Sequence, residues 1–301
     1  MKNVQKQSTN QSNLLIMQKI LVTGSNGQIG NEIRVASSRY TNFEYFFTDV
    51  DELDICNKQA LEMFVAENGI NIIVNCAAYT AVDKAEEDVE LCFRINRDAV
   101  KNIGEIASKN NLKVVHVSTD YVFDGTNHLP YTEDMPVCPA TVYGKSKLEG
   151  EQALMQVCDN VIILRTSWLY SSFGNNFVKT MLKLGAERDT LNIIFDQIGT
   201  PTYAADLADA ILQIINSDNF VSGIYHYSNE GVCSWYDFTK TIHRLAGICC
   251  NVQPIKTKDY PAKTPRPHYS VLNKAKIKST YKITIPHWEE SLEKCINILK
   301  N

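Results

Sequence analysis

The sequence predicts an α/β fold built on a doubly wound parallel sheet, with a second, smaller and partly interwoven α/β domain. Short β-branched runs alternate with helical patterns from Lys19 to about Arg165. The runs are apolar throughout, and a glycine-rich turn follows the first of them. Strands of this kind are buried on both faces, which is typical of a parallel sheet covered by helices.

The first half of the chain supplies five expected strands and four expected helices. The strands are expected at residues 19–23, 44–48, 71–77, 113–118 and 161–165. The helices are expected near residues 28–38, 57–68, 89–109 and 141–157. Strands that alternate with helices form the βαβ units of a Rossmann-type sheet. Residues 17–165 are therefore predicted to form a nucleotide-binding domain.

The second half of the chain has a different residue pattern, with expected loops in which glycine, proline and aromatic residues are interleaved. Helical patterns recur near residues 175–186, 205–216, 235–246 and 288–300. Residues 166–301 are predicted to form mainly a substrate-binding domain, with some elements returning to the first sheet. Because no flexible linker separates the halves, we expect a cleft between two packed lobes, where ligands bind.

Composition excludes several classes of function. Of 301 residues, 44% are hydrophobic and 21% charged, with a net charge of −4. This balance gives no reason to expect nucleic acid or an anionic membrane as partner. Nine cysteines without a C-x-x-C pair favour a reducing cytoplasm over a disulfide scaffold. Residues 1–16 are polar and lack signal-peptide features, so we expect a disordered extension there.

The glycine-rich turn "LVTGSNGQIG" carries Gly24, Gly27 and Gly30 between a strand and a helix. Glycine permits the tight turn and the close backbone approach that a pyrophosphate needs. Gln28 and Ile29 begin the helix, whose free N–H groups can face the anion. The turn is therefore predicted to bind a dinucleotide.

Acidic residues after the second expected strand fit an adenosine ribose. Asp49 lies 19 residues after Gly30, and its carboxylate can accept hydrogen bonds from ribose hydroxyls while repelling a 2′-phosphate. NADH should therefore be accepted. Asp51 remains an alternative for this role. Asp54 and Ile55 in "LDICN" are expected against the adenine.

The third expected strand ends in "NCAAY". Small side chains at Ala77 and Ala78, followed by Tyr79, leave room for a cofactor across the edge of the sheet. Packing of a helix against the sheet would explain the alanines equally well.

Tyr143 and Lys147 in "VYGKSK" are four residues apart and share one face of a helix. An ammonium next to a phenol favours the phenolate and so tunes it for proton transfer. Lys147 can also bond a nicotinamide ribose. Lys145 is two residues from Tyr143 and points away from it.

Together, the glycine loop, the Ser/Thr pair that ends the fourth strand and Tyr143-x-x-x-Lys147 resemble the extended short-chain dehydrogenase/reductase superfamily. More narrowly, the chain from about residue 17 is similar to the dTDP-4-dehydrorhamnose reductases. The similar stretches are "TGSNGQIG", "VNCAAYTAVDKAE", "STDYVFDG", "VYGKSKLEGE", "RTSWLY", "GNNFVKTML", "DQIGTPTY" and "RPHYSVL". This resemblance implies reduction of a nucleotide-linked 4-keto-6-deoxysugar by NADH or NADPH, the last step toward dTDP-L-rhamnose.

The resemblance also implies roles for three catalytic residues. Tyr143 would protonate the developing alkoxide, and Lys147 would hold the ribose. Thr119 would hydrogen-bond the C4 oxygen of the sugar.

Five further positions match substrate contacts of the family: Asp120, Trp168, Asn175, Asn176 and Arg266. A core aromatic is the alternative for Trp168, and a helix cap for the two asparagines. Arg266 lies between two prolines and its guanidinium suits a diphosphate, although a surface arginine would read the same way.

Some relatives bind magnesium through acidic residues at a dimer contact. Glu32 matches one of these positions, whereas Ala205 stands where another acid is expected. We therefore expect no essential metal, while the resemblance still allows a homodimer.

A dehydratase of the same fold is disfavoured, whereas a 4-epimerase and a non-catalytic subunit remain open. In nucleotide-sugar dehydratases the threonine is followed by Asp-Glu, whereas here it is followed by Asp120 and Tyr121, which leaves no second carboxylate for elimination. A 4-epimerase would keep its NAD bound. A non-catalytic subunit of the kind that regulates methionine adenosyltransferase would not need Thr119, Tyr143 and Lys147 together.

Overall fold

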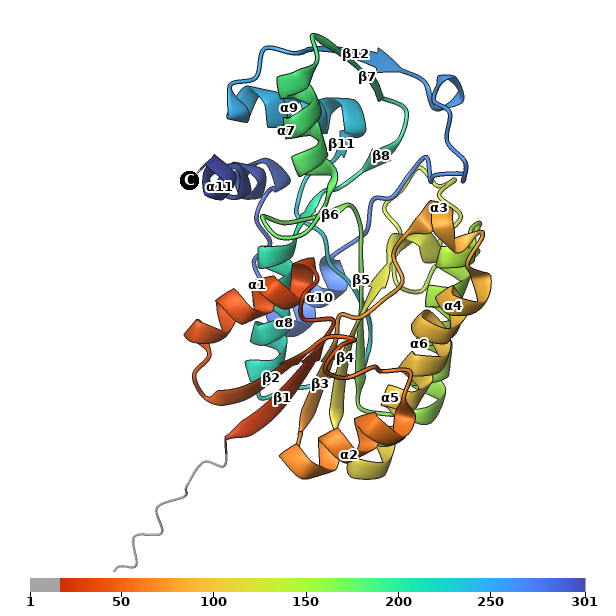
Figure 1. Ribbon diagram of the computed structural model, residues 1–301, viewed down its shortest axis with the longest axis vertical. Helices are drawn as coiled ribbons and strands as arrows, with labels where there is room; N and C mark the ends of the chain where they lie inside the picture. The colour runs from red at the N-terminus through yellow and green to blue at the C-terminus, as the bar shows by residue number, and fades with distance from the viewer. Residues whose placement is uncertain (1–16, 301) are drawn as a thin grey trace, which may run out of the picture.

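A six-stranded parallel sheet forms the centre of the computed structural model, which describes residues 17–300 (Figure 1). The extension expected at residues 1–16 lies outside the described residues. In spatial order the strands are β2 (Phe43–Thr48), β1 (Gln18–Thr23), β3 (Ile72–Asn75), β4 (Lys113–Thr119), β5 (Val161–Thr166) and β10 (Gly223–His226). Every neighbouring pair is parallel. The predicted parallel α/β sheet is confirmed, with a sixth strand from the second half of the chain.

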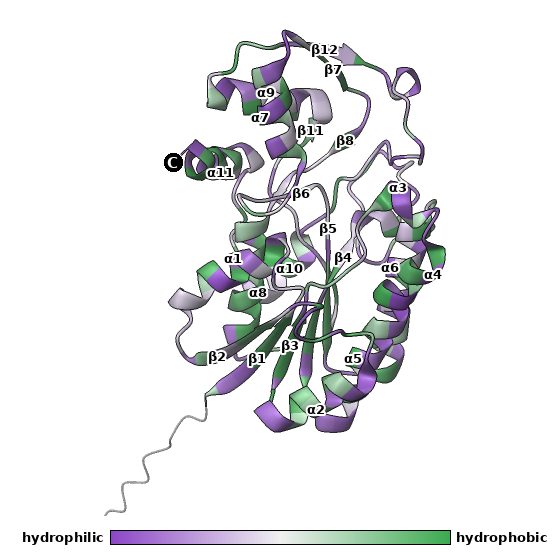
Figure 2. Ribbon diagram, in the orientation of Figure 1, coloured by the Kyte–Doolittle hydropathy of each residue, from purple (hydrophilic) through white to green (hydrophobic). Residues whose placement is uncertain are grey.

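Helices cover both faces of this sheet, as a doubly wound fold requires (Figure 1). One face packs against α1 (Gln28–Ala36), α8 (Ala204–Asn216) and α10 (Ala275–Tyr281). The other face packs against α2 (Lys58–Asn68), α5 (Ala99–Asn110) and α6 (Val142–Val157). In Figure 2 the strands between these layers are largely hydrophobic, in agreement with burial on both faces.

The single helix expected near residues 89–109 is interrupted. It consists of α4 (Val89–Phe93), a π-helical turn η2 (Arg94–Asp98) and α5. The turn packs closely against α6, where a Cβ at Gly150 would stand 2.0 Å from the carbonyl oxygen of Asn96. The side chain of Asn96 also bonds the backbone N–H and carbonyl of Tyr79. Wide turns of this kind often occur beside functional sites.

The second lobe lies at the top of Figure 1 and has its own apolar core. Its helices are α7 (Phe177–Glu187), α9 (Trp235–Ala246) and α11 (Trp288–Lys300), close to the expected positions. Its strands pair in twos: β7 (Thr190–Ile194) with β12 (Asn251–Ile255), β8 (Ile198–Gly199) with β11 (Cys233–Ser234), and β6 (Leu169–Tyr170) with β9 (Thr202–Tyr203). The remaining short helical segments are η1 (Ser37–Arg39), α3 (Val82–Ala85), η3 (Asp120–Val122) and η4 (Thr257–Asp259).

The two parts of the chain interleave, since α8, β10 and α10 come from the second half and pack on the first sheet. A boundary between two domains at residue 165 stays a prediction. No helix among the described residues 17–300 is long and apolar enough to cross a membrane.

Asn229, just after β10, joins elements that are far apart in sequence. Its amide nitrogen donates to Asp206 (2.7 Å), to the carbonyl of Pro286 (3.2 Å) and to Ser291 (3.1 Å). Its amide oxygen accepts the backbone N–H of Tyr203 at 2.8 Å. One buried side chain therefore ties the start of α8 to the start of α11.

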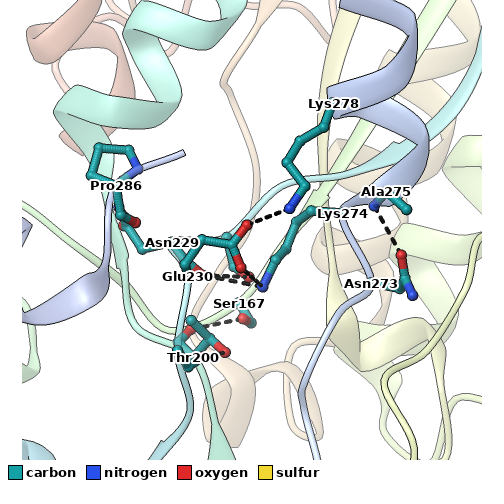
Figure 3. A network of polar contacts seen from close by, with 11 residues as sticks. Ser167, Thr200, Asn229, Glu230, Asn273, Lys274, Ala275, Lys278 and Pro286 are labelled. Atoms are coloured by element: carbon teal, nitrogen blue, oxygen red, sulfur yellow. Dashed lines mark hydrogen bonds and ion pairs between the residues drawn. The ribbon is translucent and has the colours of Figure 1, made fainter. Parts of the chain in front are cut away.

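The next residue continues this network toward α10 (Figure 3). Glu230 pairs with Lys274 at 3.4 Å and with Lys278 at 2.7 Å, while Lys274 also donates to the carbonyl of Asn229. The segment after β10 is thus held from both lobes.

We expect Asn229→Ala to lower the free energy of unfolding by about 2–4 kcal/mol, because it leaves several buried polar groups without partners. Urea denaturation measures this loss. Asn216→Ala is the matched control, since Asn216 makes one exposed contact with Asn42; it should cost less than about 0.5 kcal/mol. Equal losses in the two variants would contradict the role of Asn229.

Candidate functional site

A cavity of about 850 Å³ opens at the carboxyl ends of the parallel strands. The strand order reverses between β1 and β3, and open α/β sheets bind ligands at this switch point. The cavity extends from there to the second lobe, where Trp168 and Asn175 contribute to its wall. It therefore lies where the sequence predicts a cleft.

Most of the predicted site residues line this cavity. They are Gly24, Gly27, Gln28, Ile29, Asp49, Asp54, Ile55, Ala77, Ala78, Thr119, Asp120, Tyr143, Lys147, Trp168 and Asn175. Four predicted residues lie outside its lining: Gly30, Tyr79, Asn176 and Arg266.

Close packing explains the glycines of the loop. A Cβ at Gly24, whose φ is +65°, would stand 2.6 Å from the Cα atom of Ala77. A Cβ at Gly30 would stand 2.4 Å from the Cα atom of Ser25. Helix α1 then begins after Gly27 without a side-chain cap, so its first N–H groups are free for an anion. The loop fits a pyrophosphate.

Asp49 has a second task besides facing the cavity. Its two carboxylate oxygens accept the backbone N–H groups of Asn26 (2.9 Å) and Val50 (2.8 Å). The carboxylate therefore braces the glycine loop against the end of β2. Asp49 lines the cavity and Asp51 does not, which favours Asp49 for the predicted ribose contact.

Helix α6 carries Lys147 into a fully buried position. The helix starts at Thr141, whose hydroxyl accepts the N–H of Gly144 at 3.0 Å. Lys147 is 2% exposed. Its Nζ donates to the carbonyl of Val117 at 2.7 Å and lies 3.3 Å from Nε2 of His116. Burial lowers the pKa of Lys147 to about 8, because removal from water disfavours the ammonium.

Burial has the opposite effect on the acidic groups beside it. It raises the pKa of the Tyr143 phenol, and the hydroxyl of Thr119 partly offsets this rise. It also raises the pKa of Asp120 to about 6, while the Thr119 hydroxyl donates to Asp120 at 3.0 Å and lowers that pKa. The phenol is thus a protonated group at neutral pH. Tuning of Tyr143 by Lys147 stays a prediction.

Trp168 forms the wall toward the second lobe in a strained conformation. Its φ is +48°, a value that costs free energy for a bulky residue and persists only where the surroundings enforce it. Its ring stacks on Trp235 with centroids 3.5 Å apart and planes 10° apart. On the other side there is no room for a side chain, since a Cβ at Gly199 would stand 2.5 Å from the indole of Trp168.

Asn176 caps α7 and also reaches the glycine loop. Its amide oxygen accepts the N–H of Lys179 at 3.2 Å, and its amide nitrogen donates to Gln28 at 3.1 Å. The cap that the sequence offered as an alternative is therefore present. Substrate contact by Asn175 and Asn176 stays a prediction.

Arg266 lies next to the cavity and bonds an acid. Its guanidinium pairs with Asp83 at 2.7 Å and donates to the carbonyl of Thr264 at 3.2 Å. It lines a small neighbouring hollow together with Tyr121. Contact with a diphosphate stays a prediction, and it would require the guanidinium to share or leave Asp83.

Sequence reasoning missed about half of the lining. The further residues are Asn26, Val50, Leu53, Cys56, Cys76, Thr80, Val82, Ile95, Val117, Ser118, Tyr121, Thr166, Ser167, Leu169 and Gly174. Many of these residues directly follow a strand at its carboxyl end, and this position in the sequence could have identified them.

Glu32 is the residue that the family resemblance matches to a magnesium position. It is 5% exposed and accepts the hydroxyl of Ser171 at 2.6 Å. Burial raises its pKa. Within residues 17–300 no group of three His, Cys, Asp or Glu side chains is arranged to hold a metal ion. The expected absence of an essential metal stays a prediction.

Known proteins resemble this chain over almost its whole length. Residues 17–301 match the family model described as RmlD substrate binding domain. A protein of Aggregatibacter actinomycetemcomitans named dTDP-4-dehydrorhamnose reductase is 39% identical, over 92% of this chain and 98% of its own length.

Solved structures with the same fold include two dTDP-4-dehydrorhamnose reductases. The Clostridium acetobutylicum dTDP-4-dehydrorhamnose reductase has a TM-score of 0.90 and 44% identity, covering 94% of this chain and 100% of its own. The Bacillus anthracis dTDP-4-dehydrorhamnose reductase in complex with NADP has a TM-score of 0.90 and 37% identity, with the same coverage.

We expect Trp235→Ala to release the Trp168 ring, because the Trp235 ring stacks on one face of it. The expected result is a loss of the near-UV circular dichroism of the paired indoles and easier quenching of the remaining tryptophan fluorescence by acrylamide. Trp235→Phe is the control, since a phenyl ring keeps the stack. If both variants are quenched equally, Trp235 does not hold Trp168.

Proposed function

This chain belongs to the family described as RmlD substrate binding domain, and we propose that it reduces dTDP-4-dehydro-L-rhamnose to dTDP-L-rhamnose with NADPH or NADH. One observation carries the proposal: Thr119, Tyr143 and Lys147 line the same cavity as the glycine loop. A hydride donor bound at the loop and a ketone bound next to Tyr143 would then share one space. The names of the relatives, and the NADP in one of them, support the same reaction.

The arrangement of these residues suits reduction of a ketone. A bound nicotinamide cofactor supplies the hydride. Thr119, whose hydroxyl donates to Asp120 in this structure, would turn its O–H to the C4 oxygen of the sugar and orient it. Tyr143 would donate its proton to that oxygen as negative charge develops there. The high pKa of Tyr143 keeps the phenol protonated, which a proton donor needs. Lys147 would hold the cofactor ribose through the N–H that is not bonded to Val117 or His116.

A reductase is favoured over the other sugar-nucleotide enzymes of this fold by Tyr121. This side chain lines the cavity directly after Asp120, at the place that gives a dehydratase its second carboxylate. Its ring packs edge-on against Tyr143, with centroids 5.5 Å apart. An epimerase is distinguished by purification, since it should emerge with cofactor attached, whereas a reductase exchanges it.

The proposal also covers the compartment, the substrate class and the assembly of the protein. Nine free cysteines, several of them buried, support a reducing cytoplasm. We propose a nucleotide-sugar substrate, with no nucleic acid or membrane partner. A homodimer is the assembly to test by light scattering.

We expect the purified chain to oxidise NADPH or NADH when dTDP-4-dehydro-L-rhamnose is added, followed by the absorbance of the reduced cofactor. Tyr143→Phe should bind the cofactor normally and lose about 10²- to 10⁴-fold in kcat, because it lacks the transferable proton. Tyr45→Phe is the control, since Tyr45 lies on β2 and bonds only the carbonyl of Tyr40. No oxidation of either cofactor by the wild-type chain would sink the proposal.

Asp49→Asn should increase the preference for NADPH over NADH, taken as the ratio of the NADH dissociation constant to that of NADPH, about fivefold. The reason is that Asp49 is partly buried, and the loss of its negative charge is worth ~1 kcal/mol next to a phosphate. Asparagine keeps one acceptor for the loop. Asp49→Ala loses both bonds to the backbone and should weaken both cofactors. Asp51→Asn is the matched control for charge, and an equal change there would mean that the ribose is held elsewhere.

A further inference from the structure

Behind the catalytic pair lies a row of polar side chains that crosses the sheet. Thr23 on β1 is in register with Asn75 on β3, and Asn75 is in register with His116 on β4. Neighbours in register on parallel strands point to the same face. The three residues are 1%, 1% and 0% exposed, respectively. Such burial in otherwise apolar strands is costly unless every polar atom has a partner.

The row is hydrogen-bonded from end to end and terminates at Lys147. The hydroxyl of Thr23 lies 2.6 Å from Oδ1 of Asn75, and Nδ2 of Asn75 lies 2.9 Å from Nδ1 of His116. Nε2 of His116 then lies 3.3 Å from Nζ of Lys147. The carbonyl of Val117 accepts a second bond from Nζ at 2.7 Å.

Every member of this row can reverse its hydrogen bonds. With the amide nitrogen of Asn75 on Nδ1, the neutral imidazole of His116 carries its proton on Nε2, which then faces Lys147 as a donor and suits a neutral amine. A half-turn of the Asn75 amide places its oxygen on Nδ1–H instead. Nε2 is then bare and accepts from an ammonium, while Thr23 accepts from the amide nitrogen.

We propose that His116, held by Asn75 and Thr23, is a positioning residue that keeps the Lys147 amine hydrogen-bonded in both of its protonation states. The inference rests on the proposed function for its effect on turnover. Val117 and His116 occupy two directions of the amine. The third direction is left for the cavity that Lys147 lines, where the amine would hold the cofactor ribose. The row supplies this geometry without adding a charge, because burial lowers the pKa of His116 well below its usual value.

Other ionisable groups also face Lys147. Glu151, one turn further along α6, favours the ammonium, but it is itself in a buried ion pair with Arg165 of β5 at 2.6 Å. The thiols of Cys76 and Cys92 add smaller effects in the same direction. None of these groups lies within hydrogen-bond distance of Nζ. His116 is therefore the side-chain partner of Nζ that can change its hydrogen bond when the charge of Lys147 changes.

The consequence is a specific pH dependence. Since the pKa of Lys147 is lowered to about 8, steps that need the ammonium weaken as pH rises through about 8. Loss of the His116 acceptor removes a partner that the ammonium needs more than the neutral amine does, because hydrogen bonds to charged groups are the stronger ones. Without His116, the decrease in activity at alkaline pH should therefore begin at a lower pH.

Two carboxamide variants separate the ends of the imidazole. His116→Asn keeps a group at the position of Nδ1, next to Asn75, and loses reach to Lys147. His116→Gln keeps a group at the position of Nε2. Val115→Ala is the matched control, because Val115 lies on the same strand and packs into the core on the opposite face.

We measure kcat and KM from pH 6 to 10, and in parallel the pH dependence of NADPH dissociation without substrate, by energy transfer from tryptophan to nicotinamide. His116→Asn should move the alkaline fall of both curves down by about one pH unit. kcat should then be about twofold lower at pH 7 and about tenfold lower above pH 9, with KM for the sugar unchanged. His116→Gln should keep the wild-type midpoint. Val115→Ala should lose stability without a shift.

Unchanged curves in His116→Asn, or an equal shift in Val115→Ala, overturn the proposal. If His116→Asn does not fold, Asn75→Ser takes its place, since it removes the partner of Nδ1 and should shift the curves in the same direction; no shift there also overturns it. A wild-type chain that binds NADPH but does not turn over would reject the proposed function alone, because the binding curves still test His116.

Discussion

The close approach of the glycine loop to the end of β3 is the constraint on which the site depends. Gly24 lies so near the backbone of Ala77 that no side chain fits between them. This contact lies at the point in the sheet where the strand order reverses. Because the loop is held there, and braced from β2 by Asp49, the free N–H groups of α1 and the carboxyl end of β4 open onto one cavity.

Burial then gives each acid–base group its character. Burial raises the pKa of Tyr143, which stays a protonated phenol, and lowers the pKa of Lys147 to about 8. Both effects follow from the same removal of water. The buried amine lacks hydrogen bonds to bulk water, and the carbonyl of Val117 and the imidazole of His116 replace them. The apolar strand that ends in "STDY" is thus also the support of the catalytic lysine, through a histidine in the middle of its apolar run.

The second lobe forms the other wall of the cavity, where Trp168 is stacked on a second ring and has a strained backbone conformation. Trp168 adopts a left-handed backbone conformation between Trp235 and Gly199. The network around Asn229 joins this lobe to α8, which itself packs on the first sheet. The wall is therefore fixed relative to the glycine loop by the interleaving of the chain, and not by contacts within either half alone.

Sequence patterns by themselves determined the parallel sheet, the glycine loop and the Tyr143/Lys147 pair. These features depend on local spacing: apolar runs specify buried strands, and residues four apart share a helix face. The position of Asp49 also followed from its distance to the loop.

Only the tertiary structure decided what these groups touch. The in-register row from Thr23 to His116 depends on strand order, which no local pattern encodes, because β3 pairs with both β1 and β4. The ion pair of Arg266 with Asp83 joins residues 183 positions apart, and the stack of Trp168 on Trp235 likewise joins two distant segments. Contacts of this kind arise when separate elements pack together, and the sequence determines them only through the whole fold.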